Sequence, residues 1–210
     1  MLGRHQCLIY EGSPSRNLPS LVATIKQKLK ENNRCLYLDS PPMVAGMRSY
    51  LAAAGVDVVS EMDKATLVLS SAQAHLVGGK FDVEMMMETL QHAVTQALKD
   101  GYDGLWACGD MTWEFGPKND FSKLLEYEWA LEEFIRTHAA LSGICLYHGD
   151  TLPREALHNG LLTHPCIFVN ETLSKINPHF VPQTVGIHGA ATVSELDWTL
   201  DRLFQSAEIN

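Results

Sequence analysis

The sequence alternates short apolar runs with helical patterns along most of its length, and this alternation restricts its fold more than any other feature. Apolar runs bounded by turn residues are typical of strands buried on both faces. Because parallel strands need a covering crossover between them, the alternation predicts an α/β fold with a mostly parallel sheet and helices on both faces. The expected strands are Gln6–Tyr10, Arg34–Leu38, Val56–Val59, Leu67–Ser70, Gly104–Gly109, Ser142–Tyr147 and Cys166–Val169.

Helices are expected between these strands, where apolar residues recur at the spacing of one helix face. Asp82 is the expected N-cap of the longest helix, and Gly101 its stop. No repeat, low-complexity tract or linker divides the chain, so we expect one domain over residues 1–210. The expected helices are Leu18–Glu31, Met43–Ala54, Asp82–Asp100, Phe121–Ala139, Arg154–Leu162 and Val193–Phe204.

Charge and composition exclude several classes of protein. The net charge is −9, from 16 Lys and Arg against 25 Asp and Glu, and no basic stripe is present, so direct binding of nucleic acid is not expected. No apolar run approaches the roughly 20 residues of a membrane helix, and the stretch from Cys7 to Tyr10 is too short for the core of a signal peptide. We therefore expect a cytoplasmic protein without membrane contact.

Cysteine and histidine spacing predicts no cofactor and no metal. The five cysteines fall in different expected strands without a CxxC pair, which favours reduced, structural thiols. None of the nine histidines shows the HxxxH spacing of a helical zinc site.

Ligands of open parallel sheets bind beyond the carboxyl ends of the strands, so the residues that follow each expected strand are candidates. They combine acidic, hydroxyl and aromatic side chains, which suit a polar pocket but also serve as helix caps and loop residues. These candidates are Glu11, Asp39 with Ser40, Ser70 with Ser71, Asp110 with Trp113, His148 and Asn170.

The loop after the first strand lacks the features that hold a triphosphate. Residues 11–17 contain one glycine and no lysine, Pro14 removes an amide donor, and Glu11 repels phosphate. Gly78-Gly79-Lys80 also fails as a phosphate loop because Phe81 stands where Ser or Thr is required, so these are interpreted as loop glycines. With no Gly-x-Ser-x-Gly elbow either, we do not expect an enzyme, although weak residual nucleotide hydrolysis stays open.

Taken together, residues 5–182 resemble the MEDS domain, the methanogen/methylotroph sensory domain of the DcmR regulator, through short matches that occur in the same order. The matching residues are His5–Glu11, Arg34–Leu38, Gly55–Val58, Gly79–Asp82, Gly109–Trp113, Leu124–Glu128, Cys145, Tyr147, His164–Pro165 and Asn177–Pro178. The resemblance implies a RecA/KaiC-like fold without the phosphate-binding loop, and a role in sensing one-carbon compounds or other small hydrocarbon derivatives. Leu146 and His148 depart from the family, which tends to have Gln and an acid at these places.

The first hypothesis is a non-catalytic sensory domain that binds a small molecule at the strand ends and signals through a protein partner or self-association. A degenerate nucleotide-binding protein, with Mg²⁺ held by Asp110 and Glu128, is the second hypothesis. A pure interaction module is the third. The expected ligand-binding residues are His5, Glu11, Asp110, Trp113, Glu128, Tyr147 and His164.

Overall fold

A computed structural model describes residues 4–116, 118, 120–168, 174–187 and 190–207 of the chain. Seven strands form one sheet in the order β3-β2-β6-β7-β1-β8-β9, in which only β9 runs antiparallel. The predicted α/β fold with a mostly parallel sheet is therefore confirmed, and it is consistent with a RecA-like α/β fold. The strands are β1 His5–Tyr10, β2 Asn33–Leu38, β3 Leu67–Ser70, β6 Gly104–Asp110, β7 Leu141–His148, β8 Cys166–Phe168 and β9 Ser174–Ile176.

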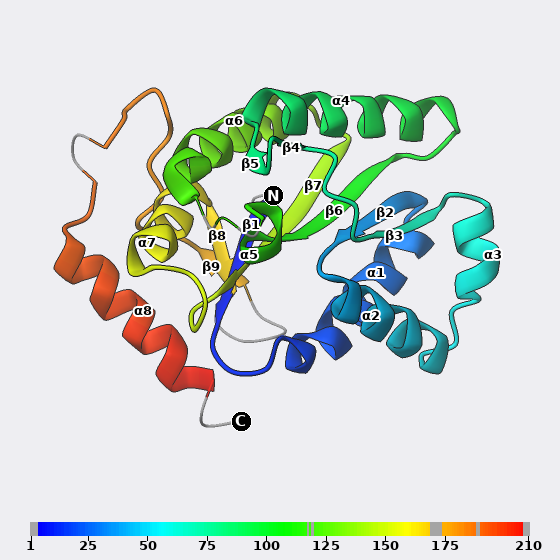
Figure 1. Ribbon diagram of the computed structural model, residues 1–210, viewed down its shortest axis with the longest axis horizontal. Helices are drawn as coiled ribbons and strands as arrows, with labels where there is room; N and C mark the ends of the chain where they lie inside the picture. Colours follow the sequence, from blue (N-terminus) through cyan, green and yellow to red (C-terminus); the bar gives the residue numbers. More distant parts are fainter. Residues whose placement is uncertain (1–3, 117, 119, 169–173, 188–189, 208–210) are drawn as a thin grey trace.

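Helices cover both faces of this sheet (Figure 1). Helices α1 and α2 pack on one face, and α4, α6, α7 and α8 pack on the other. The α-helices are α1 Leu18–Lys30, α2 Pro41–Ala53, α3 Val58–Asp63, α4 Val83–Lys99, α5 Met111–Glu114, α6 Leu124–Thr137, α7 Arg154–Thr163 and α8 Val193–Ala207. Two 3₁₀ turns, Pro14–Asn17 and Phe121–Lys123, precede α1 and α6.

The first strand shows why the apolar runs are continuous rather than alternating. Cys7 and Ile9 join the core beneath α4, α6 and α7, whereas Leu8 and Tyr10 join the core beneath α1 and α2. Since successive strand side chains point to opposite faces, a strand covered on both faces needs apolar residues at every position.

The strand order reverses between β1 and β7, which are neighbours in the sheet. After β1 the chain crosses to β2 on one side, and after β7 it crosses to β8 on the other side of β1. Such a reversal leaves a crevice at the carboxyl ends of the strands, where open α/β sheets bind ligands.

One expected strand is wrong: Val56–Val59 leads into helix α3 instead. The side chain of Asp57 accepts a hydrogen bond from the amide of Ser60 at 3.1 Å and caps this helix. The cap outweighs the strand preference of three nearby valines. The end of the expected strand Cys166–Val169 and the candidate Asn170 lie outside the described residues.

Three short elements were not expected from the sequence: α5, β9 and a hairpin of β4 Leu76–Val77 with β5 Lys80–Phe81. The hairpin turns at Gly78 and Gly79, whose φ angles are 60° and 75°. Positive φ at both central positions suits glycine, which confirms the interpretation of these residues as loop glycines. Among the described residues, no helix has the length and apolar character needed to cross a membrane.

The cap of α4 gives a direct test of the predicted helix boundary. Asp82 accepts a hydrogen bond from the amide of Met85 at 2.9 Å. We expect Asp82→Ala to lower the free energy of unfolding by about 1 kcal/mol, measured by urea denaturation. Asp82→Asn keeps an acceptor and serves as the control. An equal loss in both variants would contradict a capping role.

Candidate functional site

The structure divides the seven expected ligand-binding residues between two places. Asp110 and Trp113 line an open cleft at the carboxyl ends of the strands, and Glu11 is exposed beyond the end of β1. His5, Glu128, Tyr147 and His164 lie together in the core instead.

None of these four core residues lines the cleft at the strand ends, where one shared pocket was expected. His5 begins β1 and Tyr10 ends it, so the two Cα atoms lie about 17 Å apart in an extended strand.

The open cleft has a volume of about 540 Å³ and an acidic and aromatic lining. Asp39, Asp110 and His148 follow or end three strands of the sheet, and the half-buried Trp113 forms part of the wall. This volume is typical of a small-molecule site. The expectation that residues which follow the strands surround a crevice at their carboxyl ends is met by these four side chains.

Two buried carboxyl groups dominate the electrostatics of the cleft. Asp110 caps α5 by accepting a hydrogen bond from the Trp113 amide at 2.8 Å, and the Tyr37 hydroxyl donates to Asp39 at 2.7 Å. Burial, followed by the nearby charge of Asp39, raises the pKa of Asp110 from 3.8 to about 7. Burial also raises the pKa of Asp39. Paired carboxyl groups of this kind disfavour an anionic ligand.

The loop after β1 already has an acidic partner. The Gly12 amide donates to the Asp150 carboxylate at 2.8 Å, and the His148 imidazole donates to the Gly12 carbonyl oxygen at 2.8 Å. The His148 ring also stacks on Tyr10, with centroids 5.0 Å apart. A carboxylate therefore uses an amide of the loop that a phosphate would need, in agreement with the sequence interpretation.

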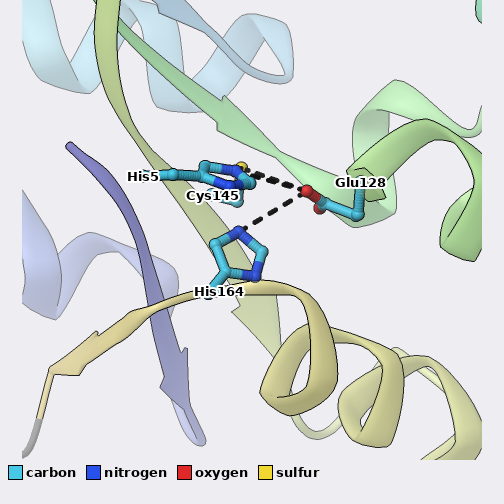
Figure 2. A group of neighbouring side chains, drawn as sticks. All are labelled: His5, Glu128, Cys145 and His164. Carbon is cyan, nitrogen blue, oxygen red and sulfur yellow. Dashed lines mark hydrogen bonds and ion pairs between the residues drawn. The ribbon is translucent and has the colours of Figure 1, made fainter. Parts of the chain in front are cut away.

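The second place is a fully buried cluster centred on the carboxylate of Glu128 (Figure 2). Its Oε2 atom lies 3.4 Å from Nε2 of His5, 3.5 Å from Nε2 of His164 and 3.9 Å from Sγ of Cys145. The four residues come from α6, β1, the residue after α7, and β7. All four ligand atoms lie within 4.8 Å of one another, so the group could hold a metal ion.

Hydrogen bonds to the outer atoms fix the orientation of these side chains. Nδ1 of His5 lies 3.0 Å from the Glu132 carboxylate, and Nδ1 of His164 lies 2.8 Å from the Gly160 carbonyl oxygen. Because both partners act as acceptors, each Nδ1 carries the proton and each Nε2 points toward Glu128. The Tyr147 hydroxyl donates to Oε1 of Glu128.

Burial and neighbouring charges shift the pKa values of the cluster in different directions. Burial acts to raise the pKa of Glu128, but the surrounding imidazoles and the Tyr147 hydroxyl outweigh it and lower this pKa. Burial, followed by His5, lowers the pKa of His164 to about 3, so this ring is neutral at neutral pH. Burial opposes protonation of His5, but Glu128 and Glu132 raise its pKa overall.

A small cavity of about 30 Å³ adjoins the cluster, between α4, α6 and the sheet. Met86, Leu90 and Leu131 contribute apolar walls, and His5, Cys145 and Glu114 contribute the polar ones. A water needs about 10–15 Å³ by this measure, so the cavity accommodates about two water-sized groups.

Glu114, which lines this cavity, has a buried oxygen atom without a partner. Its Oε2 atom is buried without a hydrogen-bond partner, and burial, followed by Glu128 and Asp110, raises its pKa well above the usual value. A Cβ atom on Gly109 would lie 1.8 Å from Oε1 of Glu114, so glycine is required there to admit the carboxyl group. The raised pKa favours the protonated, neutral form of Glu114.

Sequence reasoning missed Cys145, Glu114 and Glu132 as members of the site. All five cysteines are buried and free, as expected, but Cys145 lies 3.5 Å from Nε2 of His5. Two spacings could have pointed to this group. Cys145 and Tyr147 are two residues apart on one strand face, and Glu128 and Glu132 are four residues apart on one helix face.

The raised pKa of Asp110 predicts a pH-dependent stability. A carboxyl group whose pKa is raised in the folded state stabilises the fold at pH values below 3.8, its pKa in the unfolded chain. This contribution is lost as the pH rises through about 7, its pKa in the folded state. Replacement by Asn keeps the helix cap and removes the loss, so Asp110→Asn should be more stable than the parent at pH 8 by at most about 4 kcal/mol. The difference should shrink toward pH 4.

Urea unfolding at several pH values measures this difference, with Asp82→Asn as a capping control outside the cleft. Parallel stability curves for the parent protein and Asp110→Asn would contradict the account of Asp110.

Comparison with known proteins identifies the family of this chain. A sequence search of curated proteins finds no match for the chain. The family model of the MEDS domain, described as the methanogen/methylotroph, DcmR sensory domain, matches residues 4–165. The match includes every residue of the buried cluster and both cleft residues Asp110 and Trp113, and it covers more than half of the chain. On this match the chain belongs to the MEDS family of sensory domains.

Proposed function

We propose that this chain is a non-catalytic sensory domain which binds a small neutral organic molecule in the cavity beneath α4 and α6. The family suggests a sensory or regulatory role. The observation that carries the proposal is the unpaired, buried Oε2 atom of Glu114, a residue that lines an otherwise mainly apolar cavity. A buried polar atom without a partner is costly, so a ligand that hydrogen-bonds it would be stabilised.

The size of the cavity selects the ligand class. Room for about two water-sized groups matches a molecule with about two non-hydrogen atoms, such as methanol. A charged ligand such as formate is disfavoured because Glu128 supplies a buried negative charge beside the cavity. The proposed ligand is therefore a neutral one-carbon compound, in agreement with the substances that the family resemblance implies.

Ligand size also limits the affinity. The best small ligands gain about 1.5 kcal/mol per non-hydrogen atom, so two such atoms give a dissociation constant no tighter than about 6 mM. A sensor of this kind would respond to an abundant metabolite or growth substrate. We propose that the signal passes to a protein partner or through self-association.

The nucleotide-binding alternative has less support. Asp110 lines the open cleft, but Glu128 is buried in the cluster with His5 and does not line it, so the two acids do not face a common Mg²⁺ position. The acidic partner of the Gly12 amide further disfavours a phosphate. We accordingly expect no ATP turnover that Asp110→Asn abolishes.

A methanol titration followed by NMR tests the proposed site. We expect saturable shifts of the methyl signals of Met86, Leu90 and Leu131, with a dissociation constant of several millimolar or weaker. Leu90→Phe fills the cavity and should abolish saturation, whereas Trp113→Ala alters a residue that does not line this cavity and should leave the titration unchanged. Near-ultraviolet circular dichroism verifies that each variant is folded.

Shifts that grow linearly without saturation, or that persist equally in Leu90→Phe, would contradict binding in this cavity. Loss of the response in Trp113→Ala alone would move the site to the cleft.

A further inference from the structure

We propose that His5, Glu128, Cys145 and His164 form a binding site for a divalent transition metal ion of the zinc class. The proposal rests on the geometry of these side chains and does not depend on the binding of an organic ligand. Neither the cysteine nor the histidine spacing of the sequence indicates it, because the four ligands come from four separate segments of the fold.

Four contacts between the ligand atoms are close to those of tetrahedral coordination. Zinc bonds of about 2.0 Å to nitrogen or oxygen and about 2.3 Å to sulfur place neighbouring ligand atoms about 3.3–3.8 Å apart. Three contacts of Glu128 Oε2 and the contact between Cys145 and His5 measure 3.4 to 3.9 Å. The remaining ligand pairs lie within 4.8 Å of one another, so a central ion could reach all four atoms after side-chain shifts of up to about 1 Å.

Both histidines are arranged as metal ligands usually are. A ligating imidazole typically donates its other N–H to a carboxylate or a backbone carbonyl, which fixes the tautomer and the ring orientation. Nδ1 of His5 donates to the Glu132 carboxylate in this way, and Nδ1 of His164 donates to the Gly160 carbonyl oxygen. Each Nε2 is consequently directed at the centre of the cluster (Figure 2).

His164 supplies an observation independent of the cluster itself. Its Nε2 atom is fully buried and has no hydrogen-bond partner, although it lies 3.5 Å from a carboxylate oxygen. With the proton on Nδ1, the Nε2 lone pair faces the negative Oε2 atom of Glu128, which is unfavourable in a buried site. A cation between the two atoms removes this repulsion.

Charge and donor type select the metal. A divalent ion with the Glu128 carboxylate and the Cys145 thiolate has no net charge, which suits a buried position. Cys145 gives up its thiol proton to solvent when the ion binds. Imidazole and thiolate donors favour zinc and related ions over Mg²⁺ and Ca²⁺, which prefer oxygen.

The position of the site connects it to the rest of the core. His5 and Cys145 also line the small cavity, so an ion held by them would lie beside a ligand bound there. The ion would join β1, β7, α6 and the segment between α7 and β8. Since all four ligands are buried, the ion is expected to enter while the chain folds.

Metal loading of the full chain tests the proposal. The protein is unfolded in the presence of a chelator, refolded with Zn²⁺ or Co²⁺, freed of excess metal and analysed by mass spectrometry under native conditions. We expect one tightly held ion per chain. For Co²⁺ we also expect the visible bands of tetrahedral coordination and a thiolate-to-cobalt charge-transfer band in the near ultraviolet.

Variants assign the ion to these residues. Cys145→Ser should abolish the charge-transfer band, and His164→Gln should weaken binding at least about 100-fold. Glu132→Gln alters only the half-buried partner of His5, and it should retain the bands while weakening binding about 10- to 100-fold. Cys35→Ser and His158→Gln, which lie outside the cluster, are the matched controls and should bind as the parent does.

Refolded parent protein that retains no ion would overturn the proposal, and this outcome does not depend on the folding of any variant. An ion that binds Cys145→Ser and Glu132→Gln as tightly as the parent, with unchanged spectra, would also overturn it. Methanol binding is measured separately on chelator-treated protein, so failure of the metal site is distinguishable from failure of the proposed function.

Discussion

The buried carboxylate of Glu128 is the constraint around which the core of this protein is organised. It has no exposed surface, and it is surrounded by His5, His164 and the hydroxyl of Tyr147. A buried charge is tolerated only when its partners are well placed, and removal of one partner typically costs about 3–5 kcal/mol. One carboxylate therefore links side chains of β1, β7 and α6 and of the segment that follows α7.

In this protein the crevice at the strand ends and the cluster of polar side chains around Glu128 lie in different places. In an open α/β sheet, the functional side chains usually line that crevice. The crevice at the strand ends is present, but its acidic lining and the occupied Gly12 amide disfavour phosphate. Two of the unpaired buried polar atoms among the described residues, on Glu114 and His164, lie instead in the core. The chain thus has an α/β fold that is consistent with RecA-like folds, and its unusual polar groups lie beneath α4 and α6.

Much of the fold could be predicted because local signals agreed with tertiary structure. The apolar strands, the cap at Asp82 and the glycines of the hairpin turn depend on neighbouring residues. The helix at Val58–Asp63 was missed because a single capping side chain, Asp57, outweighed a run of β-branched residues. Strand β9 has only three residues and pairs antiparallel at an edge, so it leaves little pattern in the sequence.

The site could be predicted only in part. Asp110 and Trp113 lie at the carboxyl end of a strand. Because open α/β sheets bind ligands beyond these ends, the predicted strands are enough to identify such residues as candidates. His5 and Cys145 approach each other because β1 and β7 are adjacent, although 140 positions separate them in the chain. Spacing along the sequence can pair Cys145 with Tyr147 and Glu128 with Glu132, but it cannot show that His5 and His164 join them. The family resemblance selected His5, Glu128, Tyr147 and His164, but it did not indicate that they surround one carboxylate.

The most direct test of this account is X-ray absorption spectroscopy at the zinc edge of protein refolded with Zn²⁺. We predict a four-coordinate ion with one sulfur at about 2.3 Å and three nitrogen or oxygen atoms at about 2.0–2.2 Å. In Cys145→Ser the sulfur contribution should disappear. A six-coordinate shell of oxygen and nitrogen only, unchanged by this substitution, would contradict the assignment of the Glu128 cluster as the metal centre of the protein.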